Sequence, residues 1–303
     1  MNSYKINKTC IIIAGPTASG KTDLAIKVAK HFHTEIISAD SRQCFKELNI
    51  GVAKPTIAQL ADVKHHFINS HSIQAKVTVA DFETYALDAL ENIFKKNDIA
   101  VVCGGTGLYI KAFTDGLDDI TEASAEVKNE IALGYHQHGI TWLQQKIQAL
   151  DPLFWAEGEV QNPHRLLRAL EVFITTGKSI ITLQKGEKKQ RPFNIIKIGL
   201  TLPRHVLYNR INGRVDAMQA TGLEDEAKSL LPFKSLNALQ TVGYKELFQY
   251  FEGEISQERA FELIKQNSRH YAKRQLTWFK KDDEFMWLTQ EEVVPYLENC
   301  IKK

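Results

Sequence analysis

The chain has 303 residues, of which 44% are hydrophobic, and a formal net charge of +2. This length and composition are enough for a folded globular protein of one large domain or two modest ones. A charge so close to zero predicts no partner by itself, so any surface for nucleic acid has to be a local basic patch.

The cysteines and the apolar runs narrow the class of protein further. Cys10, Cys44, Cys103 and Cys300 lie far apart without a C-x-x-C pair, which argues against a zinc site and against a disulfide framework. No apolar stretch approaches the roughly 20 residues of a membrane span, and the N-terminus lacks the ordered features of a secretory signal. We therefore expect a soluble, cytoplasmic protein with reduced thiols and no membrane partner.

Short apolar runs alternate with helical patterns along the first hundred residues. They predict strands over residues 10–14, 35–40 and 99–105, with helices over 22–30 and 79–97. Strands that are apolar throughout and alternate with helices are typical of a parallel sheet covered on both faces. A further strand is expected over residues 193–202, followed by helices and a last strand near residue 288. The fold class is therefore α/β.

The pattern changes between residues 117 and 190, where no strand-like apolar run occurs. Successive helices are expected over residues 124–137, 139–150 and 162–177. The last of these has Pro163 near its start and Gly177 at its end, which are the usual positions of these residue types at helix ends. We expect an all-helical insertion domain over residues 117–190, and a catalytic core formed by residues 1–116 and 191–303.

The sequence GPTASGKT, residues 15–22, follows the first strand and precedes the first helix. Its glycines allow the backbone to turn N–H groups toward phosphate oxygens, and a helix beginning near Lys21 adds the positive end of its dipole. Lys21 supplies a point charge, and the hydroxyl of Thr22 suits a Mg²⁺ that bridges phosphate oxygens. The match predicts a P-loop NTPase-like core that binds phosphate or diphosphate.

The usual acidic partner of such a loop is missing at the end of the third strand, which reads VVCGGTG. On this side of the sheet Asp40 is the carboxylate at a strand end, and the carboxyl ends of parallel strands line the ligand crevice. Asp40 is therefore expected beside the phosphate loop, with helix capping as the alternative role. The glycine-rich turn that contains Thr106 is expected to line the same crevice.

Two arginines, Arg210 and Arg214, are four residues apart and so share one face of a helix. Arginine presents a rigid fork of donors to phosphate and keeps its proton near neutral pH. One of the two could clamp a leaving diphosphate. Spacing alone equally allows a salt-bridged surface helix.

A basic tail lies between Lys265 and Lys281, with six Lys or Arg residues and no acid. Tyr271, Trp278 and Phe279 are interleaved with these charges. Such a pattern suits RNA, whose backbone is held by charge and whose unstacked bases are held by aromatic rings. The alternative is a solvated basic helix whose aromatic residues pack on the core.

Two further features concern charged or ligating side chains. Arg165 and Arg168, three residues apart in the insertion, add a second basic element for a long anionic partner. The neighbouring His65 and His66 point in different directions on either a strand or a helix, so they do not form a chelating pair. We expect these histidines to pack or to form hydrogen bonds.

The motifs taken together resemble the tRNA dimethylallyltransferase (tRNA isopentenyltransferase) family. The resemblance runs from about Lys8 to Lys281 and rests on motifs that occur in the family's order: GPTASGKT, IISADSRQCFKELNIGVAKP, GGTGLY, NPHRLLRALEVFITTGK, RVDAMQATGLEDEA, TVGYKEL and YAKRQLTWFK. The chain departs from the family pattern at Arg42, where an apolar residue is usual, and at Phe45, where a tyrosine is common. These departures leave Asp40 intact.

The resemblance implies transfer of a dimethylallyl group from dimethylallyl diphosphate to an adenosine in tRNA. The acceptor would be the exocyclic amine of the adenosine immediately 3′ of the anticodon, with release of diphosphate. The loop would then hold a diphosphate leaving group rather than hydrolyse a nucleotide, which explains the missing acid. Implied partners are the tRNA anticodon stem-loop, dimethylallyl diphosphate and Mg²⁺, and we expect a monomer.

The resemblance also implies roles for individual residues. Diphosphate is assigned to the loop residues Gly15, Pro16, Thr17, Ala18, Ser19, Gly20, Lys21 and Thr22. Catalytic roles are implied for Lys21, Thr22 with Mg²⁺, and Arg214 at the diphosphate, and for Asp40 as general base on the amine. Contacts with tRNA are implied for Asp40, Ser41, Arg42, Gln43, Thr106, Lys128, His164, Arg165, Leu166, Leu167, Arg168, Gln240, Thr241, Val242, Gly243, Tyr244, Lys245, Lys273, Arg274, Gln275, Leu276, Thr277, Trp278, Phe279 and Lys280.

Three other functions use similar sequence features. A small-molecule or nucleoside kinase would bind ATP in the same loop, but it would need neither the basic aromatic tail nor the GYKEL motif. An RNA-binding protein could use the loop as a nucleotide-controlled switch, and turnover would exclude a pure binder. Prenyl transfer to free AMP is a third possibility, against which the helical insertion and the basic tail argue.

Overall fold

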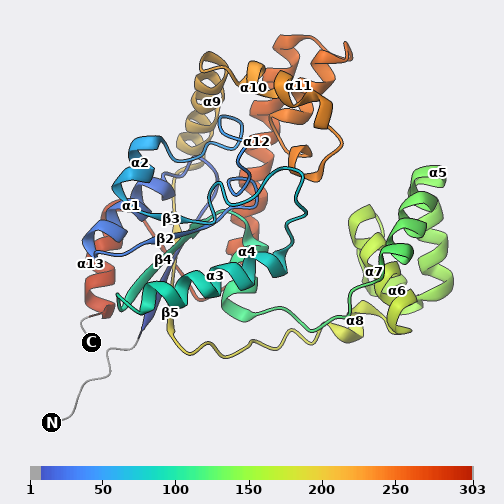
Figure 1. Cartoon of the computed structure of the whole chain (residues 1–303), viewed down its shortest axis with the longest axis horizontal. Helices are drawn as coiled ribbons and strands as arrows, with labels where there is room; N and C mark the ends of the chain where they lie inside the picture. The colour runs from blue at the N-terminus through green and yellow to red at the C-terminus, as the bar shows by residue number, and fades with distance from the viewer. Residues whose placement is uncertain (1–7, 302–303) are drawn as a thin grey trace. The chain divides into compact units, whose positions relative to one another are not determined.

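The computed structural model describes residues 8–301, which form two compact units (Figure 1). Within that range, unit 1 comprises residues 8–114 and 190–301, and unit 2 comprises Asp115–Lys189. Unit 2 thus interrupts the chain of unit 1 once. Each unit has its own buried apolar cluster.

Unit 1 is built on a parallel sheet with the strand order β3-β2-β4-β1-β5-β6. The strands are β1 (Thr9–Ala14), β2 (Ile36–Ala39), β3 (His65–His66), β4 (Ile99–Gly104), β5 (Asn194–Leu200) and β6 (Phe285–Leu288). Every neighbouring pair is parallel. The central strands β1 and β4 are buried along their whole length, as expected when helices cover both faces. The predicted α/β class and parallel sheet are confirmed.

Helices cover the two faces of this sheet with separate apolar clusters (Figure 1). On one face, Leu24 and Val28 of α1 and Val293 of α13 pack against the strands. On the other, Phe82 of α3 and Phe113 of α4 belong to a larger cluster that continues into the C-terminal helices. The helices of unit 1 are α1 (Lys21–His31), α2 (Ile57–Asp62), α3 (Val79–Phe94), α4 (Gly107–Asp115), α9 (Arg204–Ala220), α10 (Leu223–Leu230), α11 (Tyr244–Phe251), α12 (Gln257–Phe279) and α13 (Gln290–Ile301), with short 3₁₀ turns at Leu231–Phe233 and Asn237–Leu239.

Helices α9 and α12 pack against each other beside the phosphate loop. Leu207 and Ile211 of α9 form a small buried cluster with Ala272 of α12. Arg269 of α12 also donates a hydrogen bond of 2.7 Å to the side chain of Asn212 in α9. The two helices that carry most of the basic candidates are therefore fixed to one another.

Unit 2 is helical throughout. It contains α5 (Ala125–Leu150), α6 (Pro152–Glu157), α7 (Pro163–Thr176) and α8 (Ile180–Leu183). Gly139 breaks α5 with a φ of +70°, at the place where the sequence predicts the end of one helix and the start of the next. The side chain of Asn162 caps α7, and Gly177 ends it in the left-handed conformation that glycine adopts without steric penalty.

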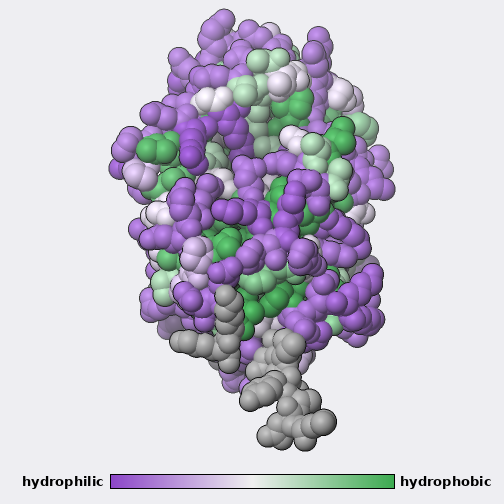
Figure 2. Space-filling model, turned by 90° about the vertical axis from the view of Figure 1, so that its left-hand side faces the viewer, coloured by the Kyte–Doolittle hydropathy of each residue, from purple (hydrophilic) through white to green (hydrophobic). Residues whose placement is uncertain are grey.

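The outer surface of the molecule is mainly polar where α1, α2 and α13 lie. Figure 2 shows hydrophilic residues over most of this face, with hydrophobic residues visible in patches between them. Among residues 8–301, no helix has the length and apolar character that crossing a membrane requires.

Candidate active site

The phosphate loop connects the end of β1 to the start of α1, as the sequence predicts. Ala18 and Gly20 have φ values of +61° and +86°, so the loop turns sharply before the helix begins at Lys21. The Lys21 ammonium folds back and donates to the carbonyl oxygen of Pro16 at 3.3 Å. The hydroxyl oxygen of Ser19 is buried without a hydrogen-bond partner among the described residues. A buried polar atom of this kind is unfavourable unless a ligand oxygen completes its hydrogen bonding.

Burial lowers the pKa of Lys21, while the nearby Asp40 carboxylate opposes this shift. A cation held in such a position is stabilised by an anion that enters the loop. The same cause lowers the pKa of Arg214, again opposed by Asp40. Two cations therefore lie in the site, and protein groups offset only part of the free energy that it costs to remove them from water.

Arg214, rather than Arg210, reaches the loop. Its guanidinium donates a hydrogen bond of 2.8 Å to the hydroxyl of Thr17. Neither arginine forms an ion pair with an acid among residues 8–301, so the salt-bridged alternative does not hold for this pair, although Asp216 of α9 forms an ion pair with Lys265 of α12. Arg210 is exposed and lines a smaller polar pocket next to the loop.

Asp40 directly follows β2 and lies in a turn. Its Oδ1 accepts hydrogen bonds from the backbone N–H groups of Arg42 at 2.9 Å and Gln43 at 3.3 Å. No helix begins within this stretch of turns, so the helix-cap alternative is wrong. The second carboxylate oxygen makes no hydrogen bond or ion pair with residues 8–301, and Asp40 lines the large cavity described below.

Thr106, in the glycine-rich turn after β4, fixes the turn that begins at Asp40. Its hydroxyl accepts a hydrogen bond of 3.1 Å from the backbone N–H of Ser41, and its own N–H donates to the Ala39 carbonyl at 3.2 Å. Tyr271 of α12 also lies in this region and lines the same cavity as Asp40. The carboxyl ends of β2 and β4 thus meet α12, as the parallel topology predicts.

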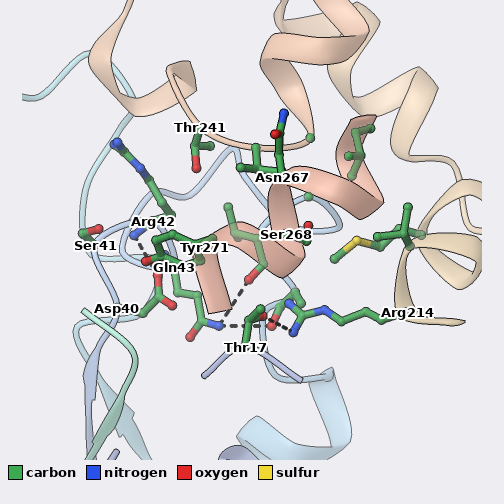
Figure 3. Close-up of a pocket in the computed structure, with 18 of the residues that line it drawn as sticks. Thr17, Asp40, Ser41, Arg42, Gln43, Arg214, Thr241, Asn267, Ser268 and Tyr271 are labelled. Atoms are coloured by element: carbon green, nitrogen blue, oxygen red, sulfur yellow. Dashed lines mark hydrogen bonds between the residues drawn. The ribbon is translucent and has the colours of Figure 1, made fainter. Parts of the chain in front are cut away.

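A cavity of about 1030 Å³ connects these groups. Figure 3 shows Arg214 and Asp40 on opposite sides of it, Thr17 between them, and Thr241 and Asn267 at the far end. Pockets for small molecules usually enclose about 300–1000 Å³, so this space has room for more than a diphosphate. Lys21, Arg214 and the phosphate loop lie at one end, and a mixture of charged, polar and apolar side chains lines the rest.

Part of the cavity wall is apolar. Ile211, Val215 and Met218 of α9 line it together with Phe248 of α11 and Ile264 of α12. Val215 and Met218 are within one helical turn of Arg214, so an apolar surface begins next to the cation that reaches the loop. A ligand with a diphosphate and a short hydrocarbon chain matches this combination.

Glu226 organises the loop that covers one side of the cavity. Its carboxylate accepts hydrogen bonds from the backbone N–H groups of Asn49, Ile50 and Gly51 at 2.9 to 3.1 Å. It also accepts a hydrogen bond of 2.6 Å from the hydroxyl of Tyr244. The motifs RVDAMQATGLEDEA and TVGYKEL therefore position a loop, although neither the loop nor this carboxylate was expected from residue spacing.

Two glutamines hold the phosphate loop from different helices. Gln275 of α12 accepts a hydrogen bond of 2.9 Å from the N–H of Thr17 and donates one of 2.8 Å to the carbonyl oxygen of Gly105. Gln290 of α13 donates to the carbonyl oxygen of Gly20 at 3.1 Å. Neither of the two contacts with the phosphate loop was predicted, because each joins residues more than 250 positions apart and a single glutamine carries no motif.

The other tRNA-contact candidates of unit 1 divide into exposed and buried residues. Several line the cavity or lie on its exposed surroundings: Ser41, Arg42, Gln240, Thr241, Val242, Lys245, Lys273, Arg274, Thr277, Trp278 and Lys280. Tyr244, Gln275 and Phe279 are buried instead, and the side chain of Gln43 donates to the carbonyl oxygens of Val52 and Ala53. The side chains of Gln43 and Gln275 make these protein contacts and also line the cavity. Contact with tRNA stays a prediction for the whole set.

In unit 2, the candidates surround the N-terminus of α7. His164 and Arg165 are exposed, and Arg165 forms an ion pair of 2.9 Å with Glu159. Leu166, by contrast, is completely buried in the core of unit 2, because it lies on the apolar face of α7. Lys128, at the start of α5, forms an ion pair of 3.2 Å with Glu122.

The neighbouring histidines have separate partners. His65 contacts the carbonyl oxygen of Val63 at 2.7 Å, and His66 contacts the carboxylate of Glu35 at 2.6 Å. Both form hydrogen bonds, as expected. Together they make up β3, an edge strand that the sequence pattern did not predict.

The oxygen donors of the cavity fit Mg²⁺. Thr22 lines it, and a hydroxyl oxygen is a ligand that this ion accepts. Mg²⁺ usually keeps several waters and is bound through one or two protein groups together with substrate phosphates. Residues 8–301 contain no cluster of three or more His, Cys, Asp or Glu side chains for a metal, so the donor set matches a shared ion rather than a cage made by the protein.

Comparisons with known proteins agree on one family. Residues 43–282 match the profile of the IPP transferase family. The chain is 49% identical to a tRNA dimethylallyltransferase of Christiangramia forsetii, covering 99% of both chains, and 44% identical to one of Cytophaga hutchinsonii, covering 95% of both. Among solved structures, it resembles a tRNA isopentenylpyrophosphate transferase of Bacillus halodurans, with a TM-score of 0.72, 34% identity and 97% of each chain covered. It also resembles a eukaryotic dimethylallyltransferase acting on tRNA, with a TM-score of 0.76, 26% identity and coverage of 93% of this chain and 74% of that one.

Proposed function

The chain belongs to the tRNA dimethylallyltransferase family, and we propose how its cavity carries out prenyl transfer. The protein is a prenyltransferase that transfers a dimethylallyl group from dimethylallyl diphosphate to tRNA. We assign the reaction to this site because the phosphate loop, Arg214 and Asp40 surround one cavity. A kinase reading is not favoured, because the relatives over the whole chain are transferases of another kind.

We assign the diphosphate to the end of the cavity formed by the loop. Cleavage of the allylic carbon–oxygen bond leaves an electron pair on the departing diphosphate, whose negative charge increases as the bond breaks. Lys21, Arg214 and the N-terminus of α1 are aimed at that charge, and preorganised donors of this kind lower the barrier. Thr22 would hold Mg²⁺ together with diphosphate oxygens, and the ion would supply further neutralisation of the leaving group.

We assign the acceptor amine to the neighbourhood of Asp40. An aromatic amine is a weak nucleophile until its proton is being removed, and a carboxylate within hydrogen-bond reach provides that removal, typically worth about 10²–10⁴-fold in rate. The turn around Asp40 supports this role, because one oxygen is fixed by two backbone N–H groups while the other has no protein partner among the described residues. The new carbon–nitrogen bond forms as the proton moves from the amine to the carboxylate.

We propose that the acceptor is the adenosine immediately 3′ of the anticodon and that the anticodon stem-loop is the part of tRNA that binds. An adenine has to leave its stack to enter the cavity, which costs a few kcal/mol, and a flexible loop keeps that cost low. The exposed cations of α12, Lys273 and Arg274, support a path for the RNA backbone. In unit 2 the candidates for contact with the RNA are His164, Arg165, Arg168 and Lys128. We further propose a monomer that acts in the cytoplasm.

The test is to incubate the protein with tRNA and dimethylallyl diphosphate and to analyse the nucleosides by mass spectrometry. The proposal predicts an adenosine heavier by one dimethylallyl group, and sequencing of the RNA fragments should place it next to the anticodon. Release of ADP from ATP with no prenylated nucleoside would favour a kinase instead. Prenylated AMP without prenylated tRNA would contradict the assignment of the acceptor.

A further inference from the structure

Gln275 is a buried polar residue in the basic part of α12. It is 7% exposed, whereas the flanking Lys273 and Arg274 project to the surface. Its amide makes two hydrogen bonds, accepting from the Thr17 N–H at 2.9 Å and donating to the Gly105 carbonyl at 2.8 Å. One side chain thus ties α12 both to the phosphate loop and to the turn after β4.

The turn after β4 is shaped to receive this amide. A Cβ atom at Gly105 would lie 2.2 Å from Nε2 of Gln275, which is closer than real Cβ contacts allow. A side chain at this position would push the end of Gln275 aside, so glycine leaves room for the hydrogen bond to the carbonyl oxygen of the same residue. The contact therefore depends on the space at Gly105 as well as on the hydrogen bonds, because α12 and the turn after β4 approach each other closely.

Thr17 receives contacts from both helices that pack beside the loop. Its N–H donates to Gln275 of α12, and its hydroxyl accepts from Arg214 of α9. The helices are joined by the buried cluster of Leu207, Ile211 and Ala272. A displacement of α12 therefore acts on Thr17 directly through Gln275 and indirectly through Arg214.

We propose that Gln275 is a positioning residue that couples the binding of RNA on α12 to the binding of diphosphate in the loop. RNA that contacts Lys273 and Arg274 fixes α12, Gln275 then fixes Thr17, and the loop is preorganised for the diphosphate. By linkage, diphosphate in the loop strengthens RNA binding by the same factor. The inference rests on the proposed function, because it takes the exposed face of α12 as an RNA-binding surface.

Gln290 provides a matched control. It also holds the loop through its side-chain amide, donating to the Gly20 carbonyl at 3.1 Å, but it belongs to α13 and not to α12. Replacing Gln290 removes this hydrogen bond to the loop and leaves the contact between the loop and α12 intact. Gln290→Met should weaken diphosphate binding by a similar factor with and without RNA.

The experiment measures the dissociation constant of inorganic pyrophosphate by calorimetry, with and without an unmodified anticodon stem-loop RNA. For the wild-type protein we expect RNA to tighten pyrophosphate binding by about 5-fold or more, the usual range of coupling between sites. In Gln275→Met the ratio of the two constants should fall to within about 2-fold, while Gln290→Met keeps the wild-type ratio. Far-UV circular dichroism and the melting temperature check that each variant is folded.

Gly105→Ala approaches the same contact from the other side and serves if Gln275→Met does not fold. It should lose the coupling too, and the double variant should lose no more than either single change, because both act on one interaction. Two results would overturn the inference. One is a wild-type protein that binds pyrophosphate equally well with and without RNA, and the other is a folded Gln275→Met variant whose ratio of the two dissociation constants equals that of the wild type. Wild-type prenylation of the same RNA, scored separately by mass spectrometry, distinguishes these results from a failure of the proposed function.

Discussion

The guanidinium of Arg214 donates a hydrogen bond of 2.8 Å to the hydroxyl of Thr17, which joins α9 to the phosphate loop. Thr17 is the third residue of GPTASGKT, so an arginine about 200 positions away completes the loop motif. The contact holds a cation at the end of the cavity where the diphosphate is proposed to leave. The same contact shows that Arg214, and not Arg210, is the arginine of α9 that reaches the phosphate loop.

Arg214→Lys should lower the single-turnover rate by about 10²–10³-fold, because lysine cannot present the arginine fork to both Thr17 and a diphosphate oxygen. The affinity for tRNA should stay within a few-fold of the wild type. The measurement is rapid-quench prenylation of saturating tRNA. Arg204→Lys, at the exposed start of the same helix, is the control and should react normally. A rate for Arg214→Lys within 3-fold of the wild type would refute this role.

Lys21→Ala should abolish most turnover while leaving tRNA binding largely intact, because the ammonium faces the phosphate loop and not the exposed face of α12. Gel shifts report the tRNA affinity, and single-turnover assays report the chemistry. Lys27→Ala removes the same charge from the exposed side of α1 and should change neither. Equal losses of affinity and of rate in Lys21→Ala would contradict the separation of the two binding surfaces.

Combined Lys273→Ala and Arg274→Ala should weaken tRNA binding and flatten its dependence on salt. Each lost phosphate contact lowers the slope of log K against log salt by roughly 0.7 to 0.9. The control is the double variant Lys95→Ala with Lys96→Ala. It removes two exposed cations just before the amino end of β4, whereas the cavity lies at the carboxyl ends of the strands. If both double variants show the wild-type slope, the basic face of α12 is only solvated and does not contact RNA.

Lys54 gives a prediction for pH. Burial lowers its pKa from 10.5 to about 8, and its ammonium donates to the carbonyl oxygen of Phe45 at 2.6 Å. Between these two pH values the unfolded chain keeps a proton that the folded protein has released. The free energy of unfolding should therefore rise with pH in that window, relative to Lys54→Met, which has no such group. Urea denaturation of both proteins at several pH values measures the difference, and a difference that falls as pH rises would show the opposite shift.

Much of the site was predictable because local sequence determines it. The phosphate loop, the start of α1 at Lys21 and the position of Asp40 after β2 follow from strand, turn and helix patterns that span a few residues each. The break at Gly139 and the end of α7 at Gly177 follow in the same way, since both glycines have positive φ. Parallel topology then brings the strand ends together without further information.

The remaining contacts depend on tertiary packing that no local pattern encodes. Arg210 and Arg214 are equivalent by spacing, and only the position of α9 against the loop selects Arg214. Gln275 looks like one more polar residue of a basic helix until α12 is packed against Gly105. The two residues of β3 are too few to show any periodicity, so that strand is visible only through its pairing with β2.

In the mechanism that we propose, Asp40 takes the proton from the acceptor amine, and Asp40→Asn is the decisive variant. Asparagine keeps an oxygen that can accept from the N–H groups of Arg42 and Gln43, so the turn should persist and the melting temperature should change little. It cannot accept the amine proton at neutral pH. The measurement is the single-turnover rate of tRNA prenylation at saturating dimethylallyl diphosphate. We predict a loss of about 10²-fold or more, with near-normal affinity for both substrates. A rate within a few-fold of the wild type would contradict it and make the departing diphosphate the next candidate to accept the proton.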